Sequence, residues 1–69
     1  MRISARNTLP GTVSKIERGA VNAEVTIEVA PGFSIVSVIT LDAVDSLRLK
    51  KGTIAYAVIK ASSVMIGVD

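Results

Sequence analysis

Two short segments, one near each end of the chain, carry the side chains best suited to bind a small anion. Each places one cation among hydroxyl or amide groups: Ser4, Arg6 and Asn7 in the first, and Lys60, Ser62 and Ser63 in the second. Arg offers a planar fork of donors and Lys a compact charge, while hydroxyls and backbone N–H groups add neutral donors. Two such cations would balance a compact dianion through charge-assisted hydrogen bonds.

Neither segment alone has enough donors to replace the water around an ion. A binding site must therefore combine the two segments, taken from one chain or from different chains. The alternative is that both segments are solvated strand ends that bind nothing. Residue types and spacing leave this alternative open.

The composition argues against catalysis. The chain has no His, no Cys and only six acids, so it lacks the usual groups for acid–base work, thiol chemistry and zinc binding. Asp42 and Asp45 fit the solvated start of a short helix, where acids are favoured. Nothing marks Lys60 as desolvated in the way of a Schiff-base lysine. We therefore expect no enzyme activity, no bound metal cation and no organic cofactor.

Nucleic acids and membranes are disfavoured as partners. Single strands stack on several exposed rings, but this chain has one Phe and one Tyr. Phe33 could be exposed beside a turn, whereas Tyr56 lies in an apolar run and is predicted to be in the core. Net charge is only +2, and Lys50-Lys51 fits a solvated turn. No apolar run reaches the ~20 residues of a membrane span, and the start lacks an apolar signal core, which indicates a cytoplasmic protein.

Alternating and apolar runs predict five strands that would position these segments. The strands cover residues 9–18, 20–29, 33–40, 53–60 and 63–68, and a short helix at 41–47 follows the third. Val13 and Ile16 break strict alternation, so a bulge is expected in the first strand. Thr40 or Asp42 is the expected helix cap. This order favours one domain, residues 1–69, that is all-β with one short helix and folds as an OB-like five-stranded barrel. A small SH3-like barrel is the alternative.

The chain is unusually apolar for a monomer of its size. Hydrophobic residues make up 49%, mean hydropathy is +0.54, and no disulfide is possible. Small domains have thin cores and rely on disulfides, metals or partner chains for support. Residues 33–40 are apolar on both faces, and 53–60 nearly so, which exceeds what one small barrel interior can hold. We expect another subunit to cover the surplus face, so the protein should be an oligomer.

Four motifs occur in order along the chain. They are ISARN (3–7) with a turn expected at Pro10-Gly11, GAVNAEVTIEV (19–29), VITLDAV (38–44) and AVIKASSVMIGV (57–68). Together they resemble the molbindins, or Mop proteins, which are small cytoplasmic molybdate-binding proteins, and the related TOBE domains of molybdate transporters and regulators. The match covers essentially the whole chain. Relatives often carry Lys at the place of Pro10, a position not assigned to the site.

The resemblance implies an OB-like subunit in a hexamer, a trimer of dimers, with oxyanions at subunit interfaces. It implies one type of site built from Ser4, Ala5, Arg6 and Asn7, with Lys60, Ala61 and Ser62 contributed by a neighbouring chain. Thr40 matches a hydroxyl position that contacts the ion in related domains. A second type of site, near the threefold axis, would use mainly the backbone N–H groups of Gly19, Ala20 and Val21, because small residues let the backbone approach an ion.

The leading hypothesis is an intracellular protein that binds molybdate or tungstate and serves its storage and homeostasis. One alternative is a regulatory module that passes an oxyanion signal to a protein partner. The other is a nucleic-acid-binding OB module without oxyanion storage.

Overall fold

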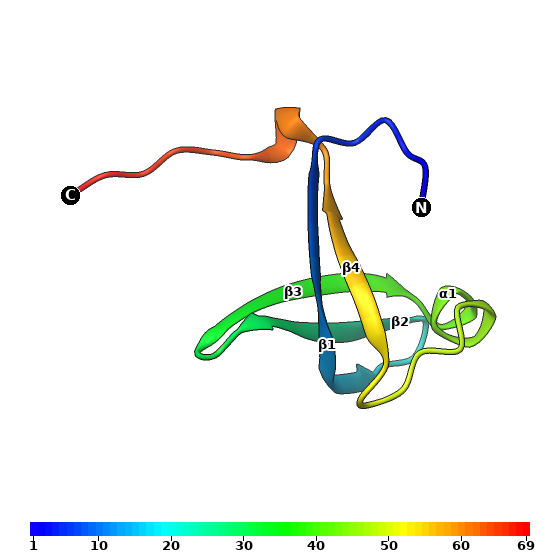
Figure 1. Cartoon of the computed structure of the whole chain (residues 1–69). Helices are drawn as coiled ribbons and strands as arrows, with labels where there is room; N and C mark the ends of the chain where they lie inside the picture. Colours follow the sequence, from blue (N-terminus) through cyan, green and yellow to red (C-terminus); the bar gives the residue numbers. More distant parts are fainter.

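A computed structural model describes all residues, 1–69, and shows a single curled antiparallel sheet with one short helix (Figure 1). The sheet has four strands in the order β3-β2-β1-β4. The elements are β1 (Asn7–Arg18), β2 (Asn22–Ala30), β3 (Phe33–Thr40), α1 (Leu41–Ser46), β4 (Ile54–Ile59) and a 3-10 turn η1 (Ala61–Ser63). β3 has the predicted bounds, and β1, β2, α1 and β4 agree with their predicted ranges to within two residues, whereas η1 was not predicted.

The core lies on the inner face of the β1–β2 pair. Alternation along β2 buries Ala23, Val25 and Ile27, as its period-two pattern predicts. The predicted bulge in β1 is confirmed, because the register with β2 shifts between Val13 and Lys15. The extra residue allows Val13 and Ile16, three positions apart, to pack against the same core.

Pro10 and Gly11 lie inside β1, so the predicted turn at this dipeptide is wrong. They pair with Tyr56 and Ala55 of β4, whereas pairing with β2 begins only at Thr12. At Pro10, β1 therefore has a neighbour on one side only, and the missing N–H costs no ladder hydrogen bond. Gly11 lies against the backbone of β2, and a Cβ there would come 2.5 Å from the carbonyl oxygen of Glu28.

The short helix α1 closes one end of the sheet. Thr40 is its cap, as predicted, since its Oγ1 accepts a hydrogen bond from the Ala43 N–H at 3.1 Å. Val44 anchors the helix in the core and is 1% exposed. Arg18 Nη2 lies 2.7 Å from Asp45 Oδ1 and ties the helix to the end of β1. Neither α1 nor η1 has the length and apolar character of a membrane-spanning helix.

The predicted fifth strand does not form within the chain. Residues beyond η1 run away from the sheet without strand pairing (Figure 1), so the two edge strands, β3 and β4, are not joined into a closed barrel. The molecule is therefore an open half-barrel. A strand needs a partner edge, and the direction in which the chain leaves η1 does not bring residues 64–68 to either edge.

The outer surface carries apolar side chains that the chain itself does not cover, as the apolar pattern of residues 33–40 predicted. Only 6 of 69 residues are buried, which makes the core thin for a chain of this length. The outer side of β3 is not covered within the chain, since Val36 and Val38 are 57% and 65% exposed. Tyr56, predicted to be in the core, is 52% exposed, because the buried positions of β4 are those of the other parity, led by Ala57. Phe33 is exposed, as expected.

Candidate functional site

The two cationic segments meet in one chain. Antiparallel pairing of β1 with β4 places Asn7 opposite Ile59, so the residues before β1 and those after β4 leave the sheet side by side (Figure 1). Between them lies a shallow hollow of about 630 Å³. It is lined by Ile3, Ser4, Ala5, Arg6, Val58, Lys60, Ala61 and Ser62. The resemblance implies that residues 4–7 and 60–62 of one site come from neighbouring chains. In the structure, however, the two segments of a single chain already lie together.

The hollow carries two positive charges and no negative one. Arg6 and Lys60 are exposed, and neither makes an ion pair. The two ion pairs of the chain, Lys15–Glu17 and Arg18–Asp45, lie elsewhere, and no acid lines the hollow. The charge of both cations is therefore available to an anionic ligand.

The turn η1 adds backbone donors to this surface. The Ser63 N–H donates to the Lys60 carbonyl at 2.8 Å and the Val64 N–H to the Ala61 carbonyl at 3.3 Å, so these carbonyls are engaged within the turn. The N–H groups of Ala61 and Ser62 donate to no acceptor of the chain. Unpaired N–H groups at the start of such a turn can receive an anion.

Two residues of the cationic segments, Asn7 and Ser63, do not line the hollow. Asn7 begins β1, is half-buried and lies just inside the sheet. Ser63, the last residue of η1, is also absent from the lining. Conversely, Ile3 and Val58 belong to the hollow and were missed. Val58 was detectable in principle, because it is two residues before Lys60 and a strand repeats its face every second residue.

Thr40 lies at the opposite end of the sheet, beside residues 19–21, which the resemblance assigns to a second type of site. It pairs with Asn22, and the next residue, Leu41, donates its N–H to the Val21 carbonyl at 3.0 Å. Within one chain, Thr40 is therefore separated from Arg6 and Lys60 by the length of the strands. Its hydroxyl oxygen accepts the cap bond, which leaves the hydroxyl proton free to donate.

The segment predicted for the second type of site, residues 19–21, joins β1 to β2 and is exposed. The Gly19 N–H already donates to the Asn22 carbonyl at 2.8 Å, so it is not free for a ligand. The N–H groups of Ala20 and Val21 have no acceptor in the chain. The adjacent cation, Arg18, is paired with Asp45, so this segment offers two neutral donors and no free charge.

Comparison with known proteins identifies the family of the chain. Residues 3–66 match the TOBE domain, and the chain belongs to this family. At the level of individual relatives, it is 52% identical over 69 residues to a probable molybdenum-pterin-binding protein of Haemophilus influenzae, covering 100% of both chains. The resemblance to Mop proteins and TOBE domains is thereby confirmed.

Solved structures of related proteins share the fold. MopII from Clostridium pasteurianum has a TM-score of 0.91 and 46% identity, over 97% of this chain and 100% of that one. The cytoplasmic molybdate-binding protein ModG, solved with molybdate bound, has a TM-score of 0.94 and 56% identity. The comparison covers 100% of this chain and 49% of the ModG chain.

Proposed function

We propose that the protein binds molybdate reversibly at sites between copies of the chain and serves as an intracellular store of this oxyanion, without catalysis. The observation that carries the proposal is the hollow in which Arg6 and Lys60 lie together with no acid to neutralise them. Molybdate binding by the related ModG supports the choice of ligand.

Each group in the hollow has a role toward a tetrahedral dianion. Arg6 directs its fork of N–H donors at two oxygens, and Lys60 adds a compact positive charge. Ser4 and Ser62 donate from their hydroxyls, and the N–H groups of Ala5, Ala61 and Ser62 donate from the backbone. Asn7 supports the segment from the first position of β1 and donates its amide if the segment closes over the ion.

The donor set favours a fully deprotonated ion. Every side chain with a polar group in the hollow is a cation or a hydroxyl, and no carboxylate is present to accept a proton from the ligand. Phosphate is partly protonated near neutral pH and would need such an acceptor. Tungstate has the same shape and charge as molybdate and should bind in the same place.

A second copy of the chain is needed to complete the site. The hollow is open and far larger than a compact tetrahedral ion, and electrostatic attraction is strong only where water is excluded. In a hexamer arranged as a trimer of dimers, neighbouring copies would cover the hollow and bring Thr40 to the ion from another chain. The N–H groups of Ala20 and Val21, repeated around a threefold axis, would form the second type of site.

The proposal is tested by calorimetric titration of the protein with molybdate, after its assembly has been sized. We expect tight binding to a hexamer, equal competition by tungstate, and no displacement by excess sulfate. Absence of binding heat, or displacement by sulfate as easily as by tungstate, would contradict the proposal and leave both cationic segments as solvated strand ends.

A further inference from the structure

Arg18 and Asp45 form the ion pair that joins β1 to α1. Arg18 is the last residue of β1, and its Nη2 lies 2.7 Å from Oδ1 of Asp45. The two side chains are 50% and 65% exposed, so water and salt screen their attraction and the pair contributes little to stability. The pair therefore opens at little cost when another anion competes for the guanidinium.

Asp45 occupies a position that α1 itself disfavours for an acid. It lies in the last turn of the helix, which ends at Ser46. The carbonyl groups at that end carry partial negative charge and repel a carboxylate. The pairing with Arg18 is the contact of the chain that stabilises this charge.

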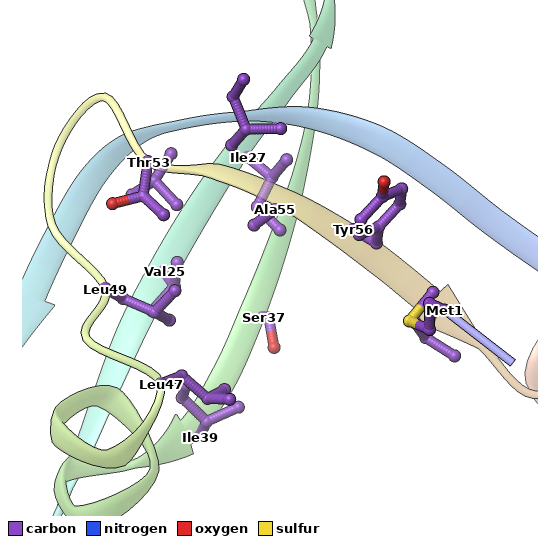
Figure 2. A pocket seen from close by; sticks show the side chains of 13 residues that line it. Met1, Val25, Ile27, Ser37, Ile39, Leu47, Leu49, Thr53, Ala55 and Tyr56 are labelled. Carbon is purple, nitrogen blue, oxygen red and sulfur yellow. The ribbon is translucent and has the colours of Figure 1, made fainter. Parts of the chain in front are cut away.

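The attachment of α1 does not depend on the ion pair. Val44 is 1% exposed and packs in the core. Leu47 and Leu49, which follow α1, point into an apolar cavity of about 380 Å³ between the helix and the strands (Figure 2). The helix should therefore stay in place when the pair opens.

A loop with two unpaired N–H groups follows Arg18 directly. The Val21 carbonyl accepts the N–H of Leu41 at 3.0 Å, which fixes this loop against the junction of β3 and α1. The N–H groups of Ala20 and Val21 have no acceptor in the chain. The Arg18 side chain makes one hydrogen bond, from Nη2, and its other N–H donors are free. Charged and neutral donors for an anion are thus adjacent.

We propose that Arg18 is the charged residue of the second type of oxyanion site and that Asp45 competes with the ion for it. This rests on the proposed binding of molybdate at residues 19–21. A dianion carries two negative charges against one on Asp45, and it also gains the N–H groups of Ala20 and Val21, so it attracts the guanidinium more strongly. Arg18 turns from Asp45 to the ion, and the carboxylate is left in water.

The competition sets the order in which the two types of site fill. In the hollow, Arg6 and Lys60 have no acid partner, so an ion binds there without displacing anything. At residues 19–21 the ion must first displace Asp45 from Arg18. The second type of site is therefore the weaker one and fills after the hollow.

Calorimetric titration with molybdate tests the competition. A chain with Arg6→Ala and Lys60→Ala isolates residues 19–21, because both cations of the hollow are gone. In this background, Asp45→Asn should raise the affinity about fivefold, since an exposed ion pair that must be broken costs about that factor. Arg18→Gln should lower the affinity at least about tenfold, because a hydrogen bond to a charged group is lost.

The two substitutions together form a double-mutant cycle. With Arg18→Gln present, Asp45→Asn should change the affinity less than about twofold, because no guanidinium remains to compete for. Glu17→Gln is the matched control. The Glu17 side chain is 66% exposed and ion-paired, but it pairs with Lys15 and faces the other side of β1. This control should leave the affinity unchanged.

Unchanged affinity in Asp45→Asn would contradict the proposal and show that the ion pair only ties α1 to β1. An equal gain with Arg18→Gln present would also contradict it, because Asp45 would then act by general charge repulsion. Binding by the native chain, with none in the isolating background, would overturn this proposal alone. Absence of binding by the native chain would overturn the proposed function as well.

Nuclear magnetic resonance of the native chain tests the exchange without relying on variants. As molybdate is added, the Nε–H signal of Arg6 should shift first. The backbone N–H signals of Ala20 and Val21 and the Nε–H signal of Arg18 should then shift together, with one weaker dissociation constant. Shifts of Ala20 and Val21 without any change at Arg18 would show that the backbone holds the ion alone and would contradict the proposal.

Discussion

Replacing Arg6 by alanine should weaken molybdate binding by about 10- to 100-fold, because a hydrogen bond to a charged group contributes ~1.5–3 kcal/mol. Arg6 is exposed and makes no hydrogen bond or ion pair in the chain, so its loss should leave the fold and its stability unchanged. Calorimetric titration gives the affinity, and circular dichroism with thermal melting checks the fold.

Lys60→Ala should weaken binding over the same range, and Lys51→Ala is the matched control. Lys51 carries the same charge at the other end of β4 and does not line the hollow. Arg6→Lys separates charge from geometry. It keeps the positive charge but loses the fork of donors, so its affinity should lie between those of the native protein and Arg6→Ala. Native affinity in Arg6→Ala would remove this residue from the site.

Gly11→Ala should destabilise the protein by about 1–3 kcal/mol, the usual cost of overpacking a close contact. The new Cβ would lie 2.5 Å from the Glu28 carbonyl oxygen and 2.7 Å from Cγ2 of Ile27. The carbonyl belongs to the backbone of β2 and cannot rotate away, so β1 and β2 must separate at this point. For a domain of this size the cost corresponds to a fall in Tm of about 5–20 °C.

Thermal melting compared with Gly67→Ala checks this prediction. A Cβ at Gly67 meets no atom of the chain within 4 Å, so that substitution should change the free energy of unfolding little. Equal melting temperatures for the two variants would show that the close approach of β1 to β2 at Gly11 contributes nothing to stability.

Local patterns in the sequence predicted the individual elements well. The alternation of residues 20–29 identified the buried face of β2, and the spacing of Val13 and Ile16 identified the bulge in β1. Thr40 was one of two candidate caps, and the structure selects it. These features depend on side-chain period and on hydrogen bonds between near neighbours, both of which are local properties.

Features that depend on distant pairing were not predictable. An apolar run has the same pattern whether or not its own chain offers a partner edge, so the sequence indicated a fifth strand that the single chain does not form. Tyr56 was placed in the core because its whole run is apolar, and only the register of β4 against β1 shows which parity is buried. Pro10-Gly11 was predicted as a turn from composition, but close contact with β2 explains the glycine.

The candidate site was predicted in outline. Cations among small hydroxyl residues marked both segments, and the pairing of Asn7 with Ile59 brings them together. Thr40 came from the resemblance alone, and one chain places it at the far end of the sheet. Two apolar residues that line the hollow, Ile3 and Val58, were missed because apolar residues beside a cation carry no distinctive signal in a sequence.

The proposed function requires that Arg6 and Lys60 hold a molybdate ion. Crystals of the protein grown with molybdate, with anomalous diffraction data collected at the molybdenum edge, locate the metal of this ion directly. We expect an anomalous peak at an ion whose oxygens lie within hydrogen-bond distance of the Arg6 guanidinium and the Lys60 ammonium. Peaks only at other places, or no peak at saturating molybdate, would contradict it.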